Sequence, residues 1–209
     1  MTIHTLDLHF QGAAHTIASY LVIGDEGPVL VETGPGSTLT NLLKQLSDHG
    51  YSAADIKHIL VTHIHLDHAG AAGWWGTRGA TVHVHAIGAP HLVDPSRLVS
   101  SAARLYGARM DALWGDILPV PEERVRIVEH GEVVNAAGLE IRAVATPGGR
   151  DVGFARIGRR ASLYDERARH DVRRQSQFRS LRASRPEPIG RRNLRHAGSR
   201  RRPPLHPCG

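Results

Sequence analysis

A dense cluster of metal-binding side-chain types lies between residues 63 and 68. The stretch reads H-I-H-L-D-H and holds three imidazoles and one carboxylate within six residues. Neutral imidazole and carboxylate are good ligands for zinc and similar divalent ions. His63 and His65 are two residues apart, so in extended backbone their side chains point the same way and could hold one ion. Asp67 and His68 could serve a second ion, or Asp67 could act as a base.

The residues around this cluster predict a strand, a tight turn and a helix. The apolar run Ile59–Val61 precedes the cluster, and the small residues Ala69–Gly73 follow it. Such an arrangement places polar side chains at the carboxyl end of a strand, where open α/β sheets bind ligands. The alternative is an ordinary surface loop, because the chain has 15 histidines and 12 of them lie in the first 150 residues. The specific H-x-H-x-D-H spacing favours a metal site.

Residues Thr62–Gly70 resemble the signature of the metallo-β-lactamase-fold hydrolases, and specifically their glyoxalase-II-like branch. The resemblance implies an α+β fold, an αββα sandwich of which this chain would carry the N-terminal portion. It implies that His63 and His65 bind a first ion together with a distant third histidine. Asp67 and His68 would bind a second ion with another distant histidine, and a distant aspartate would bridge the two. Zinc is the expected cofactor, with iron or manganese as alternatives.

Apolar periodicity predicts the elements that precede the cluster. The segments Thr16–Ile23 and Val29–Glu32, separated by turn residues at 25–28, predict a hairpin. Ser37 is the predicted N-cap of a helix from Thr38 to His49. One face of that helix would cover the sheet with Leu39, Leu42, Leu43 and Leu46.

Glu32 ends the second of these strands, directly before Thr33 and Gly34. The resembled family usually has an aspartate at this position, near the metals. A glutamate is one methylene longer and still a carboxylate. The sequence leaves two roles open for Glu32, a solvated residue at a strand end and a functional residue.

A second H-x-H, formed by His83 and His85, lies in the predicted strand Thr81–His85. We interpret these histidines as structural, because no carboxylate or further histidine follows at close spacing. The segment Ser96–Trp114 predicts one long helix that could form a lid over an active-site groove. Further strands are predicted at 124–128, 132–134 and 139–145.

The chain combines a mildly acidic body with a strongly basic end. Residues 1–150 hold 10 basic and 15 acidic residues, whereas residues 151–209 hold 16 arginines and 5 acidic residues. Residues 155–209 show no sustained periodicity and few large apolar side chains, so we expect an Arg/Pro-rich, mostly disordered tail beyond an incomplete domain at 1–154. The single cysteine, Cys208, and the absence of a leader pattern or a membrane-length apolar run predict a cytoplasmic protein without membrane contacts.

The family pattern stops near residue 149. The segment Ala145–Gly148 resembles the element that introduces the third ligand of the first ion, but Gly149 and Arg150 follow instead of histidine. The stretch at 151–154 could be a remnant of the next strand. No distal ligand is recognisable among the later candidates, which are Asp165, His170, Asp171, His196 and His206. A slip of the coding frame is the favoured explanation, and the others are a genuine basic arm or a divergent family member.

The resulting hypothesis is a metal-dependent hydrolase of ester or thioester substrates, in which Asp67 orients a metal-activated water. The missing distal ligands make the activity of this chain doubtful and favour an inactive fragment as one alternative. Another alternative is a phosphodiesterase of the same fold that binds nucleic acid through the arginines, although the acidic body would oppose this. An incomplete sandwich would also leave the inner face of one sheet uncovered.

Overall fold

The computed structural model of the protein describes residues 1–145 and 152–156. Its strands are β1 (Thr2–Asp7), β2 (Ala18–Gly24), β3 (Gly27–Val31), β4 (His58–Leu60), β5 (Thr81–His85), β6 (Val125–Val128), β7 (Val133–Ala136), β8 (Leu139–Ala145) and β9 (Val152–Arg156). Its α-helices are α1 (Leu39–Asp48), α2 (Leu66–Ala69), α3 (Ala72–Gly76), α4 (Ala89–Val93), α5 (Ser96–Tyr106) and α6 (Met110–Trp114). Within this part of the chain no helix has the length and apolar character needed to cross a bilayer.

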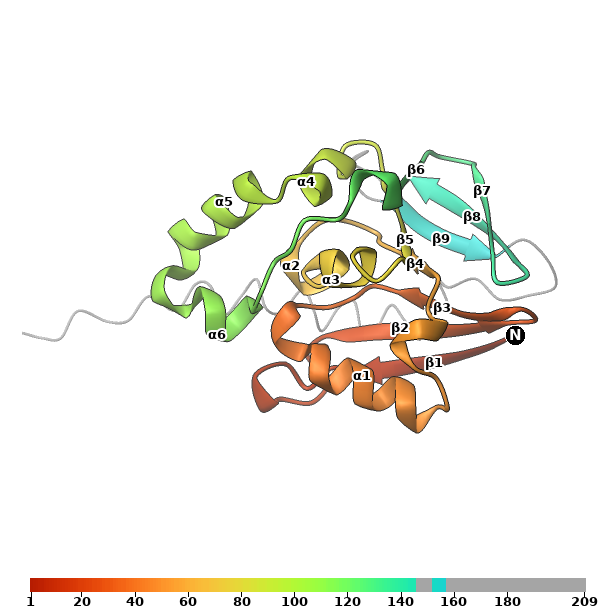
Figure 1. The fold of residues 1–209 in the computed structure, drawn as a ribbon, viewed down its shortest axis with the longest axis horizontal. Helices are drawn as coiled ribbons and strands as arrows, with labels where there is room; N and C mark the ends of the chain where they lie inside the picture. Colours follow the sequence, from red (N-terminus) through yellow and green to blue (C-terminus); the bar gives the residue numbers. More distant parts are fainter. Residues whose placement is uncertain (146–151, 157–209) are drawn as a thin grey trace, which may run out of the picture.

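Six strands form one mixed sheet in the order β1-β2-β3-β4-β5-β6 (Figure 1). The first three strands are antiparallel, and β2 and β3 form the predicted hairpin. From β3 to β6 the strands are parallel, with Leu30 opposite Ile59 and Ile59 opposite Val82. Parallel strands end at the same edge of a sheet. The segments that leave β3, β4 and β5 therefore start side by side, and the histidine cluster is one of them.

A helical layer covers one face of this sheet. Leu42 and Leu46 of α1 are fully buried in the same core as Leu30 and Ile59, as the leucine spacing predicted. Trp75 of α3 is also fully buried there.

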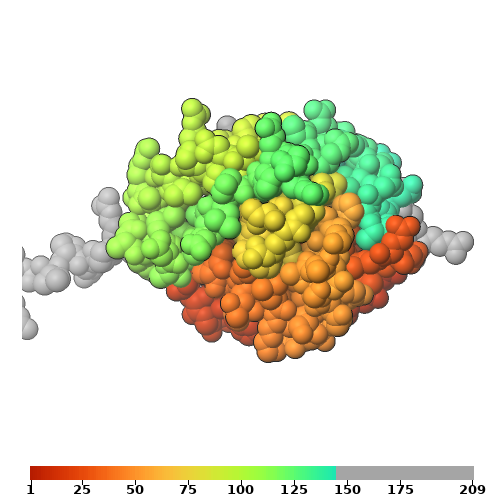
Figure 2. Space-filling model, in the orientation of Figure 1, coloured from red at the N-terminus to blue at the C-terminus, as the bar shows by residue number. Residues whose placement is uncertain are grey.

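The backbone of α3 lies very close to the segment after α6. A Cβ on Gly73 would lie 1.9 Å from the backbone oxygen of Leu118, so only glycine allows this approach. In Figure 2 the yellow atoms of the α3 region emerge between the orange α1 region and the green segment that follows α6.

The other face of the six-stranded sheet is covered by a three-stranded antiparallel sheet, β7-β8-β9. Between the two sheets lies a second apolar core. It contains Val22, Val29, Val31, Leu60 and Val128 from the first sheet and Val134, Ala136, Leu139, Ile141 and Ala143 from the second. The expectation of an uncovered inner face is wrong at these positions. The described residues thus form the first three layers of an αββα sandwich, which confirms the expected fold class.

Two sequence-based expectations for the helices are wrong in detail. The segment 96–114 is not one helix, because Gly107, at φ +52°, separates α5 from a 3₁₀ turn at Gly107–Arg109 and then α6. Ser37 does not cap α1, which starts at Leu39 after a 3₁₀ turn. Instead the Ser37 hydroxyl donates to the Leu113 carbonyl oxygen at 2.6 Å.

This contact is one of several that fix α6 to the body of the protein. The Phe10 ring stacks on Trp114 with ring centroids 5.6 Å apart. The Gln11 side chain donates to the Ala112 carbonyl at 2.7 Å. By contrast, α5 has a single buried residue, Ala102, which is still 8% exposed. If part of this region moves as a lid, it is α5 rather than α6.

Candidate metal site

The backbone around the histidine cluster turns sharply from strand to helix. Strand β4 ends at Leu60, and α2 begins at Leu66 with His65 as the last residue before it. The His65 carbonyl accepts the amides of His68 at 2.9 Å and Ala69 at 2.8 Å. This first helical turn brings residues 65 and 68 onto neighbouring positions of the same surface.

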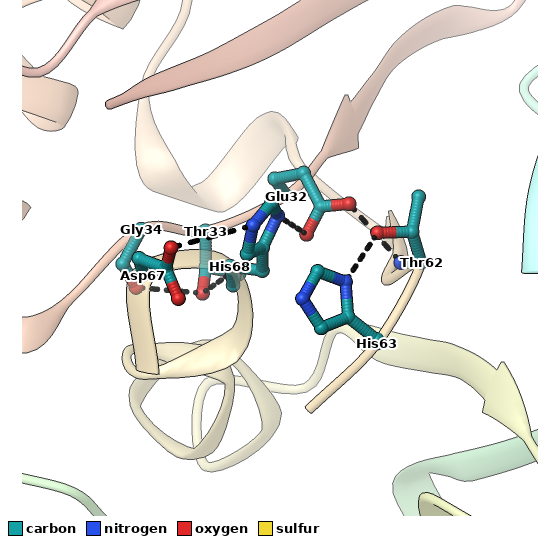
Figure 3. Close-up of polar contacts among 7 residues, drawn as sticks. All are labelled: Glu32, Thr33, Gly34, Thr62, His63, Asp67 and His68. Carbon is teal, nitrogen blue, oxygen red and sulfur yellow. Dashed lines mark hydrogen bonds and ion pairs between the residues drawn. The ribbon is translucent and has the colours of Figure 1, made fainter. Parts of the chain in front are cut away.

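The four side chains singled out in the sequence lie together (Figure 3 draws three of them). The ring centroid of His63 is 3.9 Å from that of His68 and 4.7 Å from that of His65. Asp67 Oδ2 lies 3.5 Å from His68 Nε2. His65 is exposed, and the other three are partly buried, so the cluster is accessible from solvent.

The donor chemistry of this cluster fits a divalent ion, because imidazole nitrogen and carboxylate oxygen are the ligands that zinc takes in proteins. Within residues 1–145 and 152–156, however, no three such side chains converge in an arrangement that could hold an ion. His63, for example, directs Nδ1 at the Thr62 hydroxyl, 3.0 Å away. The distal ligand positions considered from the sequence, at Gly149 to Asp151 and beyond residue 156, lie outside the described residues. The assignment of His63, His65, Asp67 and His68 as metal ligands, and of Asp67 as catalytic, stays a prediction.

Glu32 joins this cluster from the end of β3. Its side chain is buried, and its backbone is left-handed at φ +62°, which turns the chain sharply at this point. Oε1 accepts the backbone amide of Thr62 at 3.1 Å, and Oε2 lies 3.4 Å from His68 Nδ1 (Figure 3). The interpretation of Glu32 as a solvated residue is therefore wrong.

The charge state of Glu32 follows from two opposing effects. Burial by itself raises the pKa of the carboxyl, because a charge is costly away from water. Electrostatic attraction to His68, together with the contacts that His68 and Thr62 make with the carboxyl, outweighs burial and holds the pKa of Glu32 below its ordinary value. An ionised carboxylate thus faces Nδ1 of the His68 ring.

A backbone clamp connects the loop after β3 to the start of α2. The His68 carbonyl accepts the amides of Thr33 at 2.7 Å and Gly34 at 3.1 Å, and the Thr33 hydroxyl at 3.1 Å. The Gly34 carbonyl in turn accepts the amide of Ala71 at 2.9 Å. Sequence reasoning missed this clamp, although Thr-Gly directly after an acidic strand end was a signal for it.

The second H-x-H serves another purpose. His83 is buried between the sheets, and its Nε2 lies 3.2 Å from Nδ1 of His58. Burial, together with the neighbouring His58 and Arg126, lowers the pKa of His83 from 6.5 to about 4. The Nδ1 of His85 accepts the amide of Ile87 at 3.4 Å. These contacts agree with the structural interpretation of both histidines, while the role of His58 was missed.

Comparison with known proteins places this geometry in a family context. A model of the metallo-beta-lactamase superfamily matches residues 13–182. The lactamase-like protein aptB of Emericella nidulans is 32% identical over 132 residues, which are 62% of this chain and 32% of that protein. The lactamase-like protein nscB of Trichophyton equinum is 25% identical over 142 residues, 68% of this chain and 32% of that protein. The chain spans about a third of the length of these relatives.

Solved structures share the fold. A metallo-beta-lactamase family protein from Thermus thermophilus superposes with a TM-score of 0.56 at 24% identity, covering 73% of this chain and 55% of that one. BJP-1, a subclass B3 metallo-beta-lactamase of Bradyrhizobium japonicum, gives 0.53 at 24% identity, covering 69% and 52%. At these identities the likeness concerns the fold alone.

Proposed function

Because the chain belongs to the metallo-β-lactamase superfamily, we propose that it is a zinc-dependent hydrolase of ester or thioester substrates, as in the glyoxalase-II-like branch. Members of this superfamily are hydrolases whose fold generally binds divalent metals. One observation carries the proposal. Three imidazoles and a carboxylate gather at the carboxyl end of β4, with centroids 3.9 and 4.7 Å apart for the two ring pairs that include His63.

In this proposal His63 and His65 hold one ion, and Asp67 and His68 hold a second beside it. A bound zinc ion lowers the pKa of its water to about 7 and polarises a carbonyl. Alternatively, Asp67, whose side chain is 39% exposed, would orient the attacking water instead of binding the second ion. Thr62, through its contact with Nδ1, holds the ring of His63 in place.

The surface beside the cluster supports a partly apolar acyl group. Ile87 follows β5 at the same edge of the sheet and is 53% exposed. A Cβ at the next residue, Gly88, would lie 2.7 Å from Ile64 Cγ2, so this loop packs directly against the histidine segment. Trp74 and Trp75 contribute little to this surface, because Trp75 is fully buried and Trp74 is covered by the Arg78 guanidinium, 3.7 Å from the ring centroid.

The test is hydrolysis by the full chain with added zinc, measured on acyl thioesters, aryl esters, lactones and a phosphodiester. We expect turnover of thioesters or esters that is lost in a His63→Ala/His65→Ala variant. A His49→Ala variant is the matched control, because His49 is an exposed histidine at the end of α1. Turnover of the phosphodiester alone would favour the nucleic-acid alternative. Zinc binding without any turnover would favour an inactive relative.

A further inference from the structure

The contact between Glu32 Oε2 and His68 Nδ1, at 3.4 Å, points to a specific role for this carboxylate. We propose that Glu32 is a positioning residue that holds the proton of His68 on Nδ1, so that Nε2 is the nitrogen presented to a divalent ion. This inference rests on the proposed metal site, but it concerns the state of the ring before any ion binds.

The buried carboxylate needs a donor at the place where His68 lies. Glu32 Oε2 is buried, and among the described residues no donor other than His68 Nδ1, 3.4 Å away, is placed to satisfy it. A buried carboxylate oxygen is costly to leave without a donor, and it can only accept. A proton on Nδ1 therefore satisfies both groups, whereas a lone pair there would face the negative oxygen.

The opposite nitrogen of the ring has a different environment. Nε2 of His68 lies 3.5 Å from Asp67 Oδ2, and the Asp67 side chain is 39% exposed against 6% for Glu32. An exposed carboxylate can exchange this contact for water or for an ion, but the buried one cannot. The two carboxylates thus contact opposite nitrogens of the ring. Of these two contacts, only the one between Nε2 and Asp67 can be replaced by water or by an ion. Metal-binding histidines commonly donate their second ring nitrogen to a carboxylate in this way.

Backbone hydrogen bonds hold Glu32 and His68 next to each other. The residue after Glu32 donates twice to the His68 carbonyl, from the Thr33 amide at 2.7 Å and from the Thr33 hydroxyl at 3.1 Å. Because Glu32 Oε1 is engaged by the Thr62 amide, the carboxylate is also fixed against rotation. Glu32 therefore cannot turn away without losing the hydrogen bond from Thr62, and the clamp keeps the backbone of His68 beside it.

The fixed Oε1 contact makes Glu32→Gln a sharp test. The Thr62 amide requires an acceptor, so the amide oxygen of the glutamine takes the Oε1 position and the NH₂ group takes the Oε2 position. A donor then faces His68 Nδ1 and stabilises the opposite tautomer, with the proton on Nε2. Glu26→Gln is the matched control, because Glu26 is exposed in the turn between β2 and β3.

The experiment measures ring-nitrogen NMR shifts of the metal-free full chain in mildly alkaline solution, with the His68 signal assigned by its loss in His68→Asn. We expect a protonated Nδ1 in the unmodified chain and in Glu26→Gln, and a protonated Nε2 in Glu32→Gln. Zinc affinity, measured in parallel, should fall about 10–100-fold in Glu32→Gln and stay unchanged in Glu26→Gln.

A protonated Nε2 in the unmodified chain would overturn the inference, and this measurement does not depend on the variant folding. So would an unchanged tautomer in a folded Glu32→Gln. Different results would contradict the two proposals. If zinc binds equally well to the unmodified chain and to Glu32→Gln, the metal site stands but Glu32 has no positioning role. If Nδ1 of His68 is protonated but the chain binds no zinc, the contact with Glu32 stands but the metal site is wrong.

Discussion

Nδ1 of His58 and Nε2 of His83 lie 3.2 Å apart across the neighbouring parallel strands β4 and β5. Two imidazole nitrogens at this distance share one proton when both rings are neutral. A further proton at this contact would give one ring a positive charge between the sheets, close to Arg126, and would set two N–H groups against each other. Because of this pair, the folded state should lose stability as the pH falls.

The first prediction concerns stability against pH. The unfolded chain takes up a proton at His83 near pH 6.5, whereas the folded chain resists it until about pH 4. The contribution is thus fully present above pH 6.5 and is lost as the pH falls toward 4. With about 1.4 kcal/mol per pKa unit, the loss by pH 4 is about 3 kcal/mol. Chemical denaturation of the metal-free chain at several pH values measures it.

Other histidines also titrate in this range, so the comparison with a variant is decisive. His83→Leu should flatten the dependence between pH 4 and 6.5, whereas the exposed His49→Ala should leave it unchanged. Equal slopes in the unmodified chain and His83→Leu would show that the pair does not act as described.

The second prediction concerns the backbone clamp. Thr33→Val removes the buried hydroxyl that donates to the His68 carbonyl, and it should lower the free energy of unfolding by about 0.5–1.5 kcal/mol. Thr77→Val removes a similar bond, from hydroxyl to the Trp74 carbonyl at 2.9 Å, but in an exposed place. It should cost clearly less, because water replaces the lost partner. Denaturant titration of both variants gives the comparison, and equal losses would speak against the clamp.

The third prediction separates steric contact from backbone strain in the loop after β3. Gly34 and Gly79 both have positive φ, at +64° and +91°. A Cβ on Gly34 would lie 2.1 Å from Leu8 Cδ1, whereas a Cβ on Gly79 would meet nothing within 4 Å. Both alanine variants incur the strain, but only Gly34→Ala also overpacks the core, which adds about 1–3 kcal/mol.

Thermal or chemical unfolding of the two glycine variants tests this difference. Because the Gly34 amide donates to the His68 carbonyl, Gly34→Ala should also weaken zinc binding. If the two variants were equally stable, Leu8 would have more freedom than its complete burial indicates.

The fourth prediction concerns the region expected to form a lid. Helix α5 buries a single residue, Ala102, and that one incompletely, whereas the similarly long α1 buries Leu42 and Leu46 completely. Amides of α5 should therefore exchange with solvent faster than those of α1 or of the anchored α6. Hydrogen exchange with mass spectrometry on the full chain measures this. Protection of α5 equal to that of α1 would exclude a mobile α5.

Local patterns in the sequence predicted those parts of the fold that depend on neighbouring residues. The β2–β3 hairpin, the leucine face of α1 and the strand–turn–helix around His63 follow from periodicity and turn residues. The break at Gly107 was missed, because a glycine inside an otherwise helical pattern is often tolerated. Strand β1 was also missed, since its partners Ser19 and Leu21 lie more than ten residues away.

In the candidate site, too, the sequence predicted what depends on neighbouring residues and missed what depends on distant ones. The four side chains between His63 and His68 are close because they are adjacent in sequence, so spacing alone identified them. The burial of Glu32 and its contact with His68 depend on the pairing of β3 with β4. The partnership of His58 with His83 depends on the pairing of β4 with β5. Contacts of this kind across strands cannot be read from a local pattern.

The central claim is that the cluster at His63–His68 binds a divalent ion, and calorimetric titration of the metal-free chain with zinc tests it most directly. The account predicts about one or two bound equivalents per chain, as one- or two-ion sites of this donor type would give. It also predicts loss of binding in His63→Ala/His65→Ala and unchanged binding in His49→Ala. Failure of the unmodified chain to bind zinc, or equal binding by the double variant, would contradict it.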